Sequence, residues 1–125
     1  MQFHREVSAR TNVIRAIRDD AIQIGDQWHG SSLIVTADTL LPEWSVIAVD
    51  KLKERDLDPL WQLSPEVVLL GTGPEIRFPS PRLLSLGPAR GIGFEVMDTA
   101  AACRTYNILV HEDRRVAAAL IIPRR

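Results

Sequence analysis

The chain has 125 residues, of which 46% are hydrophobic and 25% are charged, and its net charge is -1 at pH 7. This length suits a single domain over residues 1–125 that buries a core of its own, and the composition excludes a disordered chain. A net charge near zero argues against a nucleic-acid partner, because neutralising many phosphates requires a basic face.

Cysteine usage and hydropathy indicate the cellular compartment. Cys103 is the single cysteine, so no disulfide can form within the chain and a secreted disulfide scaffold is excluded. No apolar stretch approaches the roughly 20 residues that span a bilayer. We therefore expect a soluble protein without a membrane span, in a reducing compartment, the cytoplasm.

Residues 1–18 are rich in arginine, as in a mitochondrial transit peptide. The arginines are Arg5, Arg10, Arg15 and Arg18. Glu6 and the acidic pair 19–20 argue against a transit peptide. We interpret residues 11–18 as a strand of the folded domain, because the next segment looks like its hairpin partner.

Residues 11–50 predict a β-rich meander. "TNVIRAI" (11–17) and "AIQI" (21–24) flank an acidic pair suited to a hairpin turn, and "SSLIVT" (31–36) follows the turn residues Gly25-Asp26 and Gly30-Ser31. "SVIAVD" (45–50) is read as a further short strand. The charge run over 50–58 is interpreted as a solvated loop or helix face.

Residues 66–122 predict alternating strands and helices. The expected elements are a buried strand at 67–71, a helix at 81–86 capped by Ser80, a strand at 93–98, a helix from 99 to about 111 capped by Asp98-Thr99, and a buried strand at 116–122. On the longer helix one apolar face is expected in the core, with the residues Ala102, Tyr106, Leu109 and Val110. This order of elements indicates an α/β fold.

The stretch "LLGTGPEIRFP" (69–79) raises the possibility of a phosphate-binding loop. A dinucleotide fingerprint requires a third glycine, where this chain has Ile76, and a helix that opens at once. Pro74 has no N–H group, and the helix is expected only at about residue 81. We therefore interpret the glycines as a sharp exit from a buried strand, not as a nucleotide site.

Three stretches carry a family resemblance: "LLGTG", "RFP" and "FEVMDTAAACRTYNILVHEDRRVAAALI". They resemble the Mth-like domain family, which includes the third assembly factor of mitochondrial respiratory complex I and an adipogenesis-associated vertebrate protein. The resemblance implies a three-layer α/β fold with a central mixed sheet of about five strands, flanked by helices, and an extra N-terminal β-ribbon. A bacterial member is favoured, because no long targeting extension precedes the domain.

The family supplies signature positions but no established catalytic residues. These positions are Gly71, Gly73, Arg77, Asp98, Thr99, Cys103, Thr105, Tyr106 and Asn107. A possible pocket would be formed by seven of them: Gly71, Gly73, Arg77, Cys103, Thr105, Tyr106 and Asn107. No metal site and no cofactor are expected, because no pair of ligands has useful spacing.

Each candidate residue has two interpretations. Arg77 either binds a carboxylate or phosphate in bidentate fashion or pairs with Glu75 or a helix C-terminus. Cys103 is favoured as a buried structural thiol, because His111 lies eight residues away, about 12 Å along a helix. Asn107 and its neighbours either line a pocket or satisfy buried backbone groups at a sheet edge.

No set of acid, base and nucleophile is found, so we expect a non-catalytic binding or assembly module with another protein as its partner. The alternative is a small-molecule (anion) binding protein or weak enzyme with a pocket near Arg77. Exposed apolar residues around Trp28, Trp44 or Trp61 are the first place to look for a partner surface.

Overall fold

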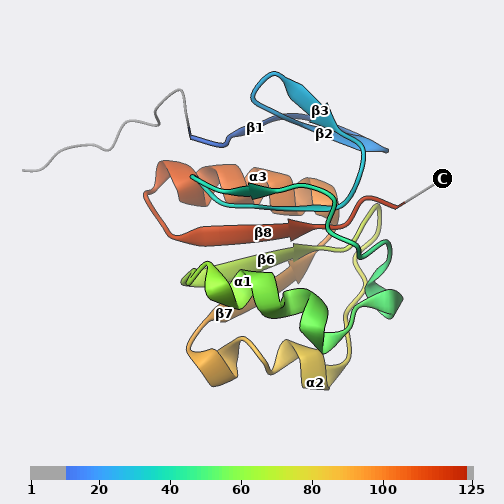
Figure 1. Ribbon diagram of the computed structural model, residues 1–125, viewed down its shortest axis with the longest axis vertical. Coiled ribbons are helices and arrows are strands. Elements are labelled where there is room, and N and C mark those ends of the chain that lie inside the picture. Colours follow the sequence, from blue (N-terminus) through green and yellow to red (C-terminus); the bar gives the residue numbers. More distant parts are fainter. Residues whose placement is uncertain (1–10, 124–125) are drawn as a thin grey trace, which may run out of the picture.

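A five-stranded mixed sheet forms the central layer of the molecule, of which the computed structural model describes residues 11–123 (Figure 1). Its strands lie in the order β5-β4-β8-β6-β7. The three strands β6, β7 and β8 run parallel, whereas β4 is antiparallel to both β8 and β5. The bounds are β4 Leu33–Val35, β5 Leu40–Leu41, β6 Val67–Gly71, β7 Gly93–Met97 and β8 Val116–Leu120.

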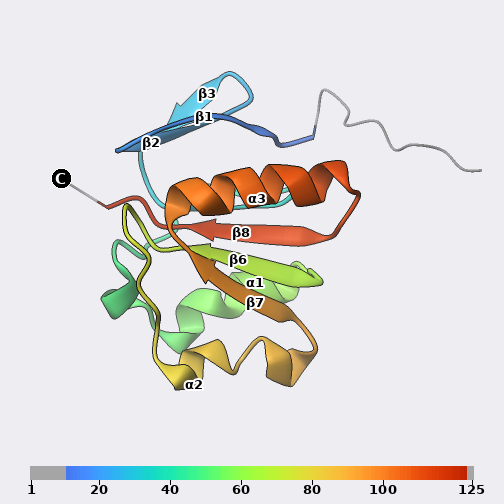
Figure 2. The same cartoon turned by 180° about the vertical axis from the view of Figure 1, so that it is seen from behind.

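A separate three-stranded antiparallel ribbon comes from the N-terminal part of the chain. It consists of β1 (Ile14–Arg18), β2 (Ala21–Ile24) and β3 (Gln27–His29). The predicted turns at 19–20 and 25–26 connect its strands. Both cartoon views place the ribbon beyond the long helix on one side of the main sheet (Figures 1 and 2).

Helices cover both faces of the main sheet. The α-helices are α1 (Asp58–Gln62), α2 (Pro81–Leu84) and α3 (Thr99–His111), and 3-10 turns cover Val49–Lys51, Glu54–Leu57 and Pro88–Arg90. Side chains of α3 pack on one face, and those of α1 and α2 pack on the other. The predicted three-layer α/β fold with an extra β-ribbon is confirmed.

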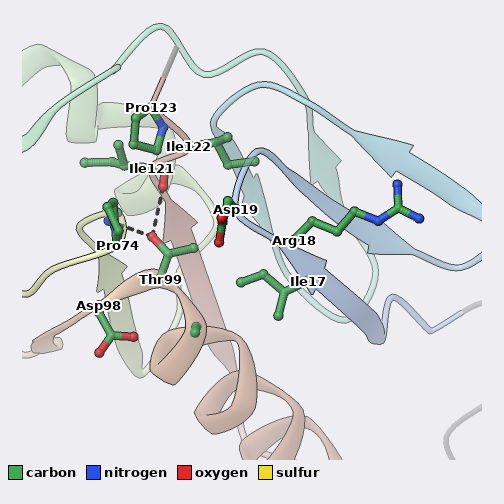
Figure 3. A pocket seen from close by; sticks show the side chains of 11 residues that line it. Ile17, Arg18, Asp19, Pro74, Asp98, Thr99, Ile121, Ile122 and Pro123 are labelled. Carbon is green, nitrogen blue, oxygen red and sulfur yellow. Dashed lines mark hydrogen bonds between the residues drawn. The ribbon is translucent and has the colours of Figure 1, made fainter. Parts of the chain in front are cut away.

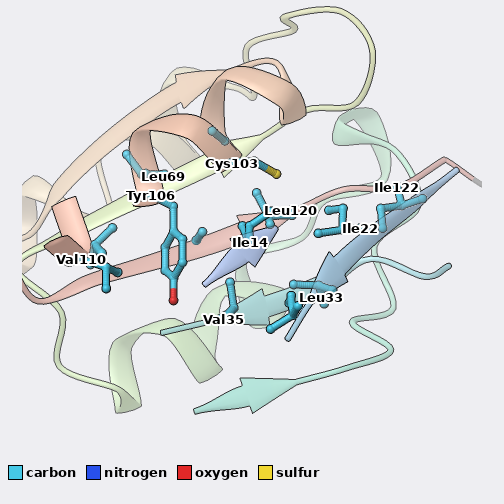
Figure 4. Close-up of a cluster of buried hydrophobic side chains, with 14 of the residues drawn as sticks. Ile14, Ile22, Leu33, Val35, Leu69, Cys103, Tyr106, Val110, Leu120 and Ile122 are labelled. Atoms are coloured by element: carbon cyan, nitrogen blue, oxygen red, sulfur yellow. The ribbon is translucent and has the colours of Figure 1, made fainter. Parts of the chain in front are cut away.

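The two faces of the sheet build two separate cores. Along β6, Val67 and Leu69 pack with α3 and the ribbon (Figure 4), whereas Val68 and Leu70 pack with α1 and α2. Successive side chains of a strand point to opposite faces, so a strand covered on both sides must be apolar throughout. Every residue of β6 and β8 is buried, as their continuous apolar runs predict.

The path of the chain explains why the helices lie on opposite faces. The connection that contains α2 runs from β6 to β7, whereas the connection that contains α3 returns from β7 past β6 to β8. Parallel crossovers are right-handed, so connections that move in opposite directions along a sheet cross opposite faces. The connections leave the carboxyl ends of the adjacent strands β6 and β7 towards opposite faces, so a crevice is expected beyond these ends, between β6 and β7.

Helix α3 fastens the ribbon to the rest of the protein. The side chain of Asn107 accepts a hydrogen bond from the N–H of Ile14 (3.0 Å) and donates one to the carbonyl of the same residue (2.7 Å). The hydroxyl of Tyr106 donates to the carbonyl of Asn12 (2.7 Å). The amide of Asn107 thus pairs with both backbone groups of one strand residue, as a neighbouring strand would.

Several boundaries and one strand differ from expectation. Residues 45–50, predicted as a strand, form no strand. Val46 and Val49 lie in the second core, three residues apart, whereas Ile47 points to solvent with 41% exposure. A strand would need alternate residues inside. The predicted meander is also divided, because β4 and β5 join the main sheet and not the ribbon.

Helix α2 ends at Leu84, two residues before its predicted end, and begins at the expected cap, where Ser80 Oγ accepts from the N–H of Leu83 (3.3 Å). The arginine-rich start of the chain, with Arg5 and Arg10, lies outside the described residues. Within residues 11–123, no helix combines the length and the hydropathy needed to cross a bilayer.

Replacing Asn107 by Ala should lower the free energy of unfolding by about 1–3 kcal/mol, because both backbone groups of Ile14 lose their partner. Chemical denaturation measures this loss, and hydrogen exchange should show faster opening of the ribbon. Thr105→Ala, on the same helix and only half-buried, serves as the control and should change stability little. Equal stability of Asn107→Ala and the unmodified chain would contradict the assigned role.

Candidate functional site

The carboxyl ends of β6, β7 and β8 meet at one edge of the sheet. Gly71, the last residue of β6, lies opposite Met97 of β7 and Leu120 of β8. The loop over 72–80, the start of α3 and the chain after β8 therefore come together at this edge, where open α/β sheets commonly bind ligands.

Thr72 fixes the loop that leaves β6. Its N–H donates to the carbonyl of Met97 (3.0 Å), and its hydroxyl donates to the carbonyl of Glu75 (2.7 Å). The same hydroxyl accepts from the N–H of Arg77 (3.0 Å), and the residue is only 5% exposed. One buried side chain thus closes the turn that presents Arg77.

Thr99 makes a second clamp at the first residue of α3 (Figure 3). Its hydroxyl accepts from the N–H of Gly73 (2.7 Å) and donates to the carbonyl of Ile121 (2.9 Å), and its own N–H donates to the carbonyl of Gly73 (2.9 Å). Asp98 caps the helix by accepting from the N–H of Ala101 (2.8 Å). The β6 loop, the β8 exit and the helix start are therefore held as one unit.

Gly71 and Gly73 stand at positions where the structure disfavours any other residue. A Cβ atom at Gly71 would lie 2.9 Å from Thr99 Cα and 3.1 Å from a methyl group of Leu120. Gly73 has φ +99°, a conformation that other residues rarely adopt. Because the N–H groups of Thr72, Gly73 and Arg77 all donate within the protein, they are not free to bind a phosphate.

Two hollows lie at this edge, on opposite sides of Pro74 and Pro123, which line both. The smaller, which we term the α3-side hollow, has a volume of about 160 Å³ and is shown in Figure 3. It is lined by the start of α3, the exit of β8 and the β1–β2 turn. The larger hollow, of about 700 Å³, contains Arg77 and is termed the Arg77 groove.

The Arg77 groove has a buried apolar floor and an exposed apolar rim. Its lining residues are Ile47, Ala48, Val49, Asp50, Leu52, Thr72, Pro74, Arg77, Phe78, Pro79, Ser80, Leu83 and Pro123. Val49, Leu52 and Leu83 are buried, whereas Phe78 is 66% and Ile47 41% exposed. Ile76, next to Arg77, is 51% exposed. Exposed apolar residues gathered beside a concave surface are typical of an interaction site.

Arg77 presents an exposed guanidinium group at this groove. Within residues 11–123 its side chain makes no ion pair and no hydrogen bond to another residue. The described part of the chain shows no pairing of this side chain with Glu75 or with a helix C-terminus. Its position is set through its backbone N–H and not through its side chain.

The residues of the predicted pocket lie in two separate places. Gly71, Gly73 and Arg77 belong to the loop after β6, whereas Cys103, Thr105, Tyr106 and Asn107 lie along α3. None of these four α3 residues lines the α3-side hollow or the Arg77 groove. Tyr106 and Asn107 instead bind the backbone of the ribbon, which is the second interpretation given for them.

Cys103 is buried in the first core with 3% exposure (Figure 4). Burial raises the pKa of its thiol from 9.0 to about 12, because a thiolate would lose its hydration. A nucleophilic cysteine requires the opposite shift. The described residues also contain no group of three or more His, Cys, Asp or Glu side chains placed to hold a metal ion.

The three tryptophans, around which exposed apolar residues were expected, are themselves largely covered. Trp44 is 9% exposed and donates from Nε1 to the carbonyl of Asp56 (3.0 Å). Trp28 and Trp61 are half-buried beneath arginine guanidinium groups, 4.0 and 4.8 Å from their ring centres. Sequence reasoning missed Ile47 and Phe78. A signal existed for Phe78, which stands in a loop between Arg77 and Pro79 with no regular element to bury it.

Comparison with known proteins finds a matching family and similar solved structures. The model of a family described as "Protein of unknown function (DUF498/DUF598)" matches residues 14–121. Among solved structures, a Xanthomonas campestris protein is 38% identical with a TM-score of 0.82, and 98% of this chain and 92% of that chain are covered. A Bordetella pertussis Mth938-like domain is 26% identical with a TM-score of 0.81 over the same shares.

Curated relatives carry two kinds of name. "NADH dehydrogenase (ubiquinone) 1 alpha subcomplex assembly factor 3" of Xenopus tropicalis is 33% identical over 131 residues, which cover 94% of this chain and 72% of that protein. The protein of that name from Bos taurus is 40% identical over 90 residues, or 67% and 49%. This chain thus spans about half the length of the bovine relative. A Francisella tularensis "13 kDa major membrane protein" is 31% identical over 101 residues, 80% of each chain.

Replacing Gly71 by Ala should lower the free energy of unfolding by roughly 1–3 kcal/mol, because the new methyl group meets helix backbone that cannot move aside. Gly30→Ala is the matched control, since a Cβ there meets nothing closer than 3.7 Å and its φ is ordinary. Thermal or chemical denaturation compares the two. Equal losses in both variants would contradict the close approach of β6 and α3.

The thiol of Cys103 should react with a disulfide reagent at pH 8 far more slowly in the folded protein than in denaturant, because both burial and its raised pKa suppress the thiolate. An exposed thiol introduced by Ile108→Cys provides the fast reference. The same shift predicts a pH dependence of the free energy of unfolding. Below pH 9 the thiol is neutral in both states and its burial contributes fully; this contribution is lost as the pH rises towards 12, because the unfolded chain ionises first. Rapid labelling of native Cys103 would show that the thiol is accessible.

Proposed function

This chain belongs to the DUF498/DUF598 family of proteins, and from that premise we propose that it is a non-catalytic module that binds a partner protein. The resemblance to the Mth-like domain family is confirmed by the family match and by the solved Mth938-like domain. Relatives named as complex I assembly factors support an assembly role. The name describes those proteins, and its extension to this chain is part of the proposal.

The single observation that carries this proposal is the apolar rim of the Arg77 groove. Phe78 and Ile47 line this groove and are 66% and 41% exposed, and Ile76, next to Arg77 in the chain, is 51% exposed. An isolated exposed apolar residue is ordinary, but two that line one recess form a surface whose burial by a partner is favourable. Aromatic and arginine side chains are also the residues that most often dominate binding at interfaces.

The loop that carries this rim is preformed. Thr72 and Thr99 fix its backbone, so Phe78 and Arg77 are presented without further ordering of the chain. Pre-ordered contact residues reduce the entropy lost on association. A binding role therefore explains why hydrogen bonds are concentrated in a loop that shows no catalytic group.

The cytoplasmic location forms part of this proposal. A lone thiol, buried in the core, suits a reducing compartment. A bacterial source is proposed as well, because the solved relatives include proteins of Xanthomonas and Bordetella. We also propose that residues 1–125 act as a single domain.

A second candidate function is the binding of a small anion. The observation in its favour is the guanidinium of Arg77, which is unpaired within residues 11–123 and lines a groove of about 700 Å³. Arginine binds carboxylate and phosphate groups in bidentate fashion. A thermal-shift screen with phosphate, citrate and nucleotides tests it. A shift of several degrees that is lost in Arg77→Ala would favour this function over the partner-binding module.

The partner-binding proposal predicts that Phe78→Ser reduces capture of the partner at least tenfold, the change expected where truncation costs about 1.4 kcal/mol. Phe78 is 66% exposed, so the variant should fold as the unmodified chain does. Tagged protein is cross-linked in extracts of the cells that make it, and the captured proteins are quantified by mass spectrometry.

Ile108→Ser is the matched control, because Ile108 is 58% exposed on α3, away from the groove. It should leave capture unchanged. If the captured proteins were the same for the unmodified chain, Phe78→Ser and Ile108→Ser, the groove would not be the docking surface.

A further inference from the structure

The charges of the Arg77 groove restrict what can cover it. Of the described residues that line it, Asp50 and Arg77 are the charged ones, and they form no ion pair with each other. Asp50 belongs to the 3-10 turn at Val49–Lys51, whereas Arg77 belongs to the loop after β6. The lining therefore carries one positive and one negative side chain among apolar residues.

Covering the apolar rim also removes Arg77 from water. Phe78 is its neighbour in sequence, and both side chains line the same groove, so a partner that buries one displaces water from the other. A guanidinium that loses its hydration without a counter-ion costs several kcal/mol. Within residues 11–123 no carboxylate is paired with Arg77, so a carboxylate of the partner can act as its counter-ion.

The shape of the site favours a protein segment over a lipid surface. The hollow of about 700 Å³ is concave and has a buried floor made by Val49, Leu52 and Leu83. An anionic bilayer is a broad surface, and its recruitment requires clusters of roughly four to eight basic residues. Here one arginine is balanced by one aspartate in the lining. A short chain segment can instead place a side chain in the recess.

We propose that the occupant of the Arg77 groove is an acidic and apolar peptide segment of a partner protein, whose carboxylate pairs with Arg77 while an adjacent apolar side chain packs between Phe78 and Ile47. This inference rests on the proposed function and adds the chemistry of the partner. Asp50, the acidic residue of the lining, disfavours a second carboxylate of the segment beside it, because like charges repel.

In the experiment, a displayed library of random nonapeptides is selected for binding to the full chain. Soluble Phe78→Ser protein is added as a competitor, so that peptides that bind elsewhere on the protein are removed. The selected peptides should be enriched in Asp or Glu within one or two positions of a large apolar residue. Their binding to Arg77→Ala should be at least tenfold weaker, and binding to Arg77→Lys should be intermediate, because lysine keeps the charge but loses the bidentate geometry. Added salt should weaken binding to the unmodified chain.

Arg104→Ala is the matched control, since Arg104 is an exposed arginine of α3 that does not line the groove. It should bind the selected peptides as the unmodified chain does. Both arginine variants should keep the melting temperature, because Arg77 makes no described side-chain bond. Amide shifts in the NMR spectrum should place the bound peptide at residues 47–52 and 72–80.

Three outcomes would overturn the inference: no peptide is selected, the peptides lack acidic residues, or Arg77→Ala binds them as tightly as the unmodified chain. Arg77-dependent sedimentation with phosphatidylglycerol vesicles, without peptide binding, would identify a membrane as the occupant and would also overturn it. The partner-capture experiment separates this failure from that of the proposed function. If Phe78→Ser loses the partner but Arg77→Ala keeps it, the docking surface stands and only the acidic chemistry is wrong.

Discussion

The hydroxyl group of Thr99 joins three segments that the sequence keeps far apart. It accepts from the loop after β6 and donates to the chain after β8, while its own backbone begins α3. The contact requires Gly71 to have no side chain, since a Cβ there would lie 2.9 Å from Thr99 Cα. The small residues of this edge therefore allow the helix, the central strand and the last strand to meet, and the loop that carries Arg77 starts from that meeting.

This constraint also explains the chemistry of the edge. The loop uses its N–H groups at Thr72, Gly73 and Arg77 to hold its own shape, so it offers few donors to a phosphate or an oxyanion. What it presents outwards are side chains, chiefly Phe78, Ile76 and the guanidinium of Arg77. A rigid loop with an apolar rim and one unpaired charge suits recognition of another molecule.

Local signals were sufficient for much of the fold. The strand β6 was predicted from its continuous apolar run, which a strand covered on both faces needs. The helix α3 was predicted from its capping residue Asp98 and from the apolar face of the 13 residues that follow. The prediction of a strand at 45–50 was wrong. Val46 and Val49 enter the second core three residues apart, and the alternation of a strand does not describe that spacing. The ribbon was anticipated, but its separation from β4 and β5 depends on which strands pair across the chain.

The sequence by itself determined the α/β class, the buried strands and the long helix, because periodicity, caps and turn residues act over short distances. Only the tertiary structure decided the roles of the polar residues. Asn107 meets Ile14 across 93 positions, and Tyr106 meets Asn12 across 94, so neither could be assigned to the ribbon from the sequence. Burial and pairing of a side chain depend on segments brought together by folding, and this is why Arg77 and Cys103, both assigned to one pocket from the sequence, lie in different parts of the molecule.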